Sequence, residues 1–193
     1  MKKLFLMAVM ALATVSSFAQ HRVGTVTIQP KVGLNLANVT KGDGDIRVGA
    51  VAGAEFEYQV SDIFSLSAGA LYSMQGCKGE VNVEGFDRSV KLDYLNIPIL
   101  ANVYVAKGLA VKLGIQPGFN VTSKASVEKG GTKVTTDLDG IESVDFSIPV
   151  GLSYEINNFV IDARYNLGVS KIMDGSDSKN SVFQFTLGYK FAL

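Results

Sequence analysis

The segment LAVKLGIQPGFNV, residues 109–121, alternates apolar and polar side chains with a period of two. Its apolar members are Leu109, Val111, Leu113, Ile115, Phe119 and Val121, and its polar or small members are Lys112, Gly114, Gln116, Gly118 and Asn120. Successive side chains of a β-strand point to opposite faces, whereas an amphipathic helix repeats about every 3.6 residues. The segment therefore predicts a β-strand with one apolar face and one polar face.

Seven further segments show the same alternation, at residues 26–36, 48–58, 64–75, 94–103, 144–155, 159–168 and 183–193. Most are close to the ~9–11 residues that a tilted membrane-spanning strand needs. After the N-terminal region, no apolar stretch is long enough for a transmembrane helix. We therefore expect an all-β fold, an eight-stranded antiparallel up-and-down transmembrane β-barrel.

The connections between these segments alternate in length. Short links at residues 59–63, 106–108 and 156–158 separate long ones around residues 39–46, 76–90, 122–143 and 170–180. In bacterial outer-membrane barrels the short turns face the periplasm and the long loops face outward. The pattern therefore predicts that both termini lie on the periplasmic side.

The composition of the polar face distinguishes a membrane barrel from a soluble one. That face is mainly Gly, Ser, Thr, Asn and Gln, whereas a soluble exterior would be rich in Lys and Glu. Aromatic residues gather near both ends of the apolar face, as the two girdles of a lipid-embedded barrel do. They are Tyr58, Phe64, Tyr154, Phe159 and Phe191 toward the short turns, and Tyr72, Phe119, Phe146 and Phe183 toward the long loops. The alternative, a soluble periplasmic lipocalin-like binding barrel, would turn the apolar face inward.

The N-terminus has the features of a secretion signal. Lys2 and Lys3 precede an apolar run over residues 4–15, and the small residues Ser17 and Ala19 follow it. We expect a signal peptide at residues 1–19, cleavage before Gln20, and one outer-membrane β-barrel domain at residues 20–193.

The charge balance and the cysteine count exclude several function classes. The chain has 18 Lys and Arg against 18 Asp and Glu, so no basic field attracts nucleic acid. Cys77 is the only cysteine, which excludes an internal disulfide and a multi-cysteine metal site. We expect Cys77 to lie in a loop.

Nine charged residues fall on the predicted lumen face. They are Lys31, Glu55, Glu57, Lys112, Asp145, Glu155, Asp162, Arg164 and Lys190. A charge inside a narrow lumen must be paired or hydrated, so we expect a lumen charge network. Its structural interpretation is an ion-paired plug, and its functional interpretation is a selectivity constriction. The plug is favoured because wide channels need about sixteen strands or more.

Arg164 is expected to have acidic partners on a neighbouring strand. Its segment lies between the segment that carries Asp145 and Glu155 and the segment that carries Lys190. Adjacent strands are ~4.8 Å apart, which brings the acids of the neighbouring strand within reach. The sequence therefore predicts pairing of Arg164 with those acids.

Catalytic, cofactor and metal sites are not expected. His21 is the only histidine, and at the mature N-terminus we expect it to be a free terminal residue without a catalytic partner. The acidic residues beside glycine near residues 43–45, 137–142 and 174–177 lack the spacing of a calcium-binding loop. We therefore predict that the chain is not an enzyme and holds no cofactor.

Four stretches carry a resemblance to a known family. They are KVGLNLAN at 31–38, KLDYLNIPIL at 91–100, ARYNLG at 163–168 and FQFTLGYKF at 183–191. The chain resembles the PorT-type outer-membrane β-barrel family of Bacteroidetes over nearly its whole mature length, with the build of small OmpA- or OmpX-like barrels. The resemblance implies recognition by the barrel insertion machinery and surroundings of outer-membrane lipid and lipopolysaccharide, but no particular activity. Ala192 and Leu193 depart from the family pattern because they follow the aromatic residue that usually ends such barrels.

These observations favour a structural or interaction role. The long connections at 76–90 and 122–143 would present the outward recognition surface to an extracellular partner. A protein partner in the periplasm is the alternative. The rival hypotheses are a small channel or transporter for an ionic or apolar solute, and the soluble periplasmic binding barrel.

Overall fold

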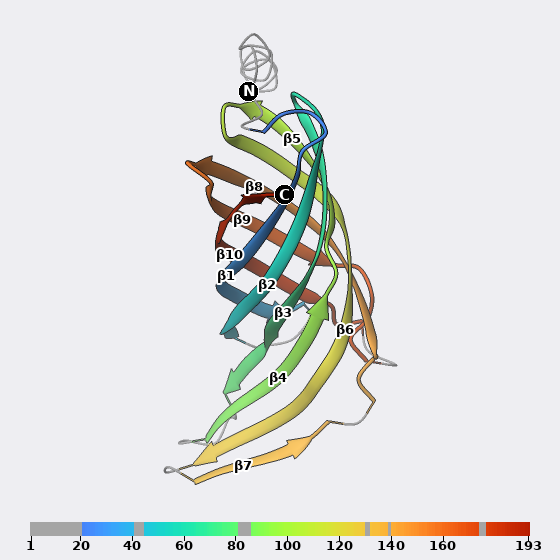
Figure 1. Ribbon diagram of the computed structural model, residues 1–193. Helices are drawn as coiled ribbons and strands as arrows, with labels where there is room; N and C mark the ends of the chain where they lie inside the picture. The colour runs from blue at the N-terminus through green and yellow to red at the C-terminus, as the bar shows by residue number, and fades with distance from the viewer. Residues whose placement is uncertain (1–20, 41–44, 81–85, 130–131, 139, 174–176) are drawn as a thin grey trace, which may run out of the picture.

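The computed structural model describes residues 21–40, 45–80, 86–129, 132–138, 140–173 and 177–193. These residues form eleven strands in one antiparallel sheet that curls on itself (Figure 1). The strands are β1 (Val26–Val39), β2 (Asp45–Ser61), β3 (Phe64–Glu80), β4 (Phe86–Asn96), β5 (Ile99–Ala106), β6 (Leu109–Lys129), β7 (Thr132–Asp137), β8 (Val144–Ile156), β9 (Phe159–Gly168), β10 (Asn180–Tyr189) and β11 (Phe191–Ala192). Within the described ranges, no helix is long and apolar enough to cross a membrane.

Pairing of the first and last long strands closes the sheet. In β1, Lys31 lies opposite Gly53 of β2 on one side and opposite Gly188 of β10 on the other. β4 and β5 share one position, because both pair with β3 and β6, and β7 pairs with β6 alone outside the ring. The described residues therefore form a ring of eight strand positions, which confirms the predicted antiparallel barrel.

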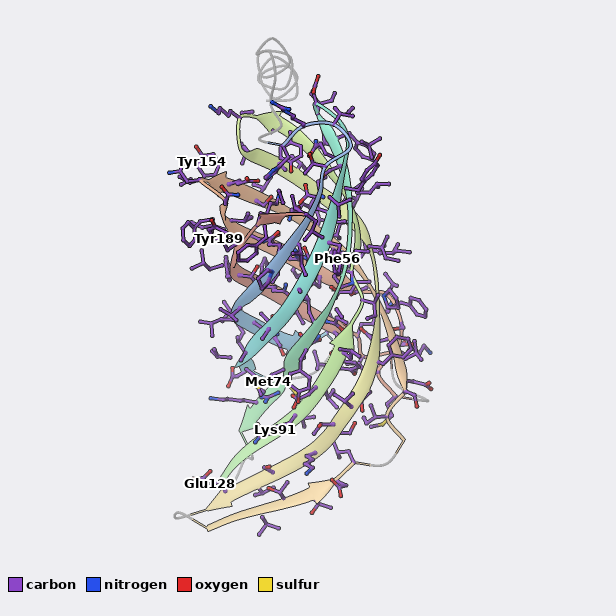
Figure 2. All side chains as sticks on the ribbon, in the orientation of Figure 1. Phe56, Met74, Lys91, Glu128, Tyr154 and Tyr189 are labelled. Atoms are coloured by element: carbon purple, nitrogen blue, oxygen red, sulfur yellow. The ribbon has the colours of Figure 1, made fainter. Side chains whose placement is uncertain are left out.

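The two faces of the sheet are those that the alternation predicts. On β6, Ile115 is 57% exposed on the outside, whereas its neighbour Gln116 is 2% exposed inside the barrel. Phe56 and Tyr154 likewise point away from the ring (Figure 2). Because the apolar side chains face outward and the polar ones inward, the soluble alternative with inverted faces is wrong.

Three tight turns gather at one end of the barrel, here called the short-turn end. They lie between β2 and β3, between β5 and β6, and between β8 and β9, as predicted. Asn157 and Asn158 adopt positive φ angles of 49° and 74°, the conformation that a two-residue hairpin turn requires. The first described residues, which precede β1, and the C-terminal Leu193 lie toward this end of the ring (Figure 1). The opposite end is called the long-loop end.

The aromatic girdles follow the predicted positions. At the short-turn end, Phe159, Tyr189 and Phe191 form a chain of ring contacts with centroid separations of 5.0 and 4.7 Å. At the long-loop end, Phe146 and Phe183 are exposed on the outer face. Two aromatic belts flanking an apolar band are the arrangement expected at the two interfaces of a bilayer.

Two of the predicted long loops are largely strand. β3 and β4 remain paired as far as Glu80 and Asp87, and β6 continues to Lys129 and turns back as β7. We call this extension, residues 77–80, 86–90, 122–129 and 132–137, the protruding sheet; it extends beyond the rest of the ring (Figure 1). Cys77 therefore lies in strand β3, opposite Val90, and not in a loop. These strands were not predicted because a strand that does not contact lipid needs no apolar face, so its sequence need not alternate.

The lipid-facing assignment of β6 gives a first prediction. Ile115 lies midway along the apolar band, and Val121 lies on the same face beyond Phe119. We expect Ile115→Arg to lower the free energy of unfolding by about 2–4 kcal/mol, and Val121→Arg by about 0–1 kcal/mol, because the cost of a charge falls toward the interface. Urea unfolding in lipid vesicles measures both. Equal losses would contradict the assignment.

Candidate functional site

Five charged side chains meet in the middle of the lumen and form what we call the central cluster. Its members are Lys31 of β1, Glu55 of β2, Lys112 of β6, and Asp162 and Arg164 of β9. Lys31 Nζ lies 2.7 Å from Glu55 Oε2, and Lys112 Nζ lies 2.7 Å from Asp162 Oδ2. All five are buried, so three cations and two carboxylates pair with one another away from water, with one cation in excess.

Arg164 connects the two carboxylates. Its Nε and Nη2 each lie 2.8 Å from an oxygen of Asp162, and its Nη1 lies 2.9 Å from Glu55 Oε1. The two-pronged contact with Asp162 is the strong, directional form of an ion pair. Because β9 and β2 are separated in the ring by β10 and β1, the contact with Glu55 reaches across the lumen.

The predicted partners of Arg164 are wrong. Its residue pair on the neighbouring strand β8 is Gly151, whereas Asp145 and Glu155 lie further along β8 in opposite directions. The order of the segments correctly predicted that β8 lies next to β9. It did not predict which residues of the two strands lie opposite one another. The sequence therefore could not place the acids at the height of the guanidinium.

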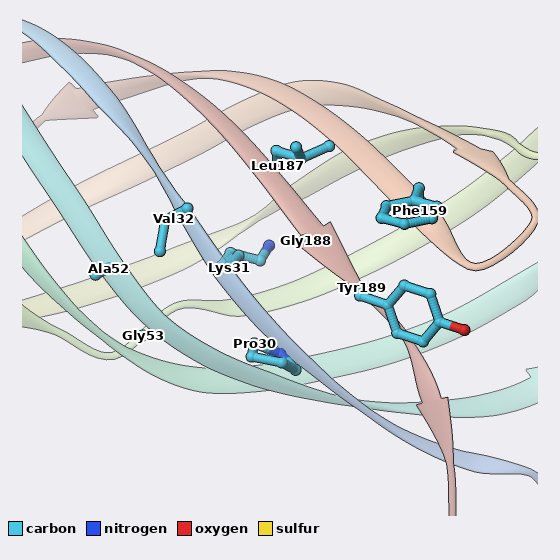
Figure 3. Close-up of a pocket in the computed structure, with 9 residues that line it drawn as sticks. All are labelled: Pro30, Lys31, Val32, Ala52, Gly53, Phe159, Leu187, Gly188 and Tyr189. Carbon is cyan, nitrogen blue, oxygen red and sulfur yellow. The ribbon is translucent and has the colours of Figure 1, made fainter.

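Glycines leave room for Lys31, one of the two lysines of the central cluster. Lys31 lies between Gly53 and Gly188 (Figure 3). A Cβ atom at Gly53 would lie 2.1 Å from the Ala70 carbonyl oxygen, and one at Gly188 would lie 2.9 Å from the Pro30 carbonyl oxygen. At both glycines the neighbouring backbone is too close for a larger side chain. The Lys31 side chain therefore has no neighbouring side chain at these two positions.

A second group, the terminal cluster, lies nearer the short-turn end. Lys190 Nζ contacts Glu57 Oε2 at 2.8 Å and Glu155 Oε2 at 3.0 Å. Glu57 Oε1 also accepts hydrogen bonds from Ser65 Oγ, at 2.6 Å, and from the Tyr104 hydroxyl. The central and terminal clusters thus lie at different heights in the lumen.

His21 belongs to the terminal cluster. Its Nε2 lies 3.0 Å from Glu155 Oε1, and the following turn is held by a hydrogen bond from the Gly24 amide to the Gln59 carbonyl oxygen. The expectation of a free terminal histidine is therefore wrong. Residues 21–25, which precede β1, contact the short-turn end, a tertiary contact that no local sequence pattern predicts.

The remaining lumen groups lie toward the long-loop end. Asp145 joins neither cluster and accepts a hydrogen bond of 2.7 Å from Ser170 Oγ. Arg47 and Asp93, which approach within 3.7 Å, were missed because they fall just outside the alternating segments. Beyond them Leu92, Tyr94 and Ile172 pack together as a buried apolar cluster.

No metal centre emerges from the described part of the chain, where no group of three or more His, Cys, Asp and Glu could hold an ion. Of the acidic residues beside glycine, Asp43, Asp139 and Asp174 lie outside the described residues. Asp177 forms an exposed ion pair of 3.1 Å with Lys171.

Comparison with known proteins identifies the family. The model of the outer membrane protein beta-barrel domain matches residues 18–174. The chain belongs to this family. The outer membrane is therefore its location, with the apolar exterior of the ring in contact with lipid. The predicted signal peptide and its cleavage site lie outside the described residues.

Two solved structures show the same fold. Ail, the attachment invasion locus protein of Yersinia pestis, is 18% identical, with a TM-score of 0.52 over 88% of this chain and 100% of that chain. Neisserial surface protein A is also 18% identical, with a TM-score of 0.54 over 86% of this chain and 97% of that chain. No curated protein matches the chain in sequence. At these identities the likeness concerns the barrel alone.

The central cluster gives a second prediction. Arg164→Gln leaves Glu55 and Asp162 with one fewer cation in a buried site, and we expect a loss of about 3–5 kcal/mol in unfolding free energy. Lys171→Gln is the control, because its ion pair is exposed and pairs of that kind contribute about 0–1 kcal/mol. Urea unfolding in lipid vesicles compares the two. Similar small losses would show that water, and not the guanidinium, satisfies the carboxylates.

Proposed function

We propose that the protein is an interaction barrel of the outer membrane, with a lumen closed by ion pairs and an outward recognition surface on the protruding sheet. The observation that carries the proposal is that β3, β4 and β6 continue past the ring and are joined there by β7. A barrel that served only to span the lipid would need no such extension.

The closed lumen argues against the rival channel. Arg164 bridges Glu55 and Asp162 across the middle of the barrel, and Lys190 bridges Glu57 and Glu155 nearer the short-turn end. An ion or solute passing through would have to separate both sets of buried pairs. An eight-stranded barrel is also just wide enough for its own side chains.

The edge of the protruding sheet supplies the means of recognition. Among the described residues β7 pairs with β6 alone, so its other edge presents backbone N–H and C=O groups. Exposed edges of this kind bind extended polypeptide segments as an added strand. Val134 of β7 is 62% exposed and would contact the side chains of such a segment. The partner we propose is therefore an extended protein segment outside the cell.

The finer assignments rest on the sequence. We propose removal of residues 1–19, a periplasmic short-turn end with both termini, and membership of the PorT-type subgroup of Bacteroidetes. The support is the signal-like N-terminus, the difference in connection length, and the four matching stretches. We also propose that the protein has no enzymatic activity. His21, the single histidine, is engaged with Glu155 in the terminal cluster.

Surface labelling tests the orientation. In a Cys77→Ser background, a cysteine at Val134 on β7 should react with a membrane-impermeant maleimide on intact cells. A cysteine at Asn157, in the turn between β8 and β9, should react only after the outer membrane is permeabilised. The reverse pattern would place the protruding sheet in the periplasm and refute the proposed surface.

Planar bilayer recordings test the closed lumen. The purified barrel should show no steady conductance, because the two sets of buried pairs fill the lumen. A stable, ion-selective current in the wild type, with a selectivity that Arg164→Gln alters, would favour the channel instead.

A further inference from the structure

A small apolar pocket opens at the long-loop end, above the charge clusters of the lumen. Its volume is about 190 Å³. The lining residues are Val39, Cys77, Val90, Leu92, Leu138, Ile141, Ile172, Met173 and Ser178. None of them is charged, and only one hydroxyl and one thiol accompany the apolar side chains. We call this cavity the mouth pocket.

Both walls of the mouth pocket are fixed in place. Strands β1, β3 and β4 form one wall, and residues outside these strands form the other, namely Leu138, Ile141, Ile172, Met173 and Ser178. The second wall is held together by the pairing of Ile141 with Met173 and by a 2.9 Å hydrogen bond from the Glu142 amide to the Ile172 carbonyl oxygen. The Leu138 amide is also tied to the Ser123 carbonyl oxygen, at 3.0 Å. The pocket is therefore formed before any ligand arrives.

Burial decreases from the floor of the pocket to its rim. Leu92 and Ile172 are 1% and 5% exposed, and Tyr94 packs against them. Met173, at the rim, is 37% exposed. Leu92 and Ile172 therefore form a buried floor and Met173 an exposed rim, so we expect a ligand to enter the pocket past Met173.

We propose that the mouth pocket binds a small, uncharged, apolar molecule about the size of one substituted aromatic ring. An apolar cavity of about 150 Å³ stays dry and binds benzene, so a cavity of this size has room for such a ligand. A charged ligand is excluded because the lining offers it no partner. The flexible thioether of Met173 can adapt to ligands of different shape. This site lies at the base of the protruding sheet, with which it shares Cys77 and Val90, and it goes beyond the recognition of a polypeptide that we propose at the edge of β7.

A toluene titration of the barrel in lipid nanodiscs tests the proposal, with Ile, Leu and Val methyl groups labelled for NMR. The methyl resonances of Leu92, Ile141 and Ile172 should shift and saturate as toluene is added. Ile115, on the lipid face, serves as an internal control. Its resonance should change in proportion to the toluene dissolved in the bilayer, without saturation.

Two filling variants localise the binding. Ile141→Phe and Met173→Phe should each weaken the saturable response at least 10-fold, because the added ring occupies the pocket. Val150→Phe, on the lipid face of β8, should leave it unchanged. If Ile141→Phe fails to assemble, the test rests on Met173→Phe. We expect that variant to assemble because residue 173 lies at the exposed rim. A wild type without saturation at the pocket methyls, or full affinity in an assembled filling variant, would overturn the proposal.

Discussion

The pairing of β1 with β10 is the constraint from which the rest of the structure follows. In a bilayer every backbone N–H and C=O group must find a partner within the protein, and a closed ring of strands provides one for each. Closure gives each strand one side toward lipid and one side toward the lumen. The apolar exterior and the enclosed polar interior are both consequences, and the interior charges must then neutralise one another.

The core of this barrel is accordingly polar. Apolar residues such as Leu71 and Leu100 do point inward, but the contacts that reach across the lumen are those of the two charge clusters. Buried ion pairs contribute less net stability than apolar packing, yet removing one partner is costly because the other charge stays buried. The clusters therefore fix how the strands face one another more than they add to the total stability.

The sequence predicted the strand positions, their two faces and the tight turns, because alternation and turn residues are local signals. It did not predict the partners of Arg164, since a period of two assigns a face but not a height along the barrel axis. Contacts made by His21 and Arg47 were missed for a related reason, because they depend on segments distant in the chain. The protruding sheet was missed because its strands lack the apolar alternation by which the membrane strands were recognised.

Strand β6 runs without a break from Leu109 at the short-turn end to Lys129 at the tip of the protruding sheet. Its hydrogen bonds to β4 and β8 are distributed along that length. A pull on the tip along the strand would load these bonds side by side, as in shear, so that many must break together. If a hinge joined the barrel to the protruding sheet, the same pull would break the hydrogen bonds one after another. A partner bound to the protruding sheet, as we propose, would therefore pull on the barrel through these bonds in shear.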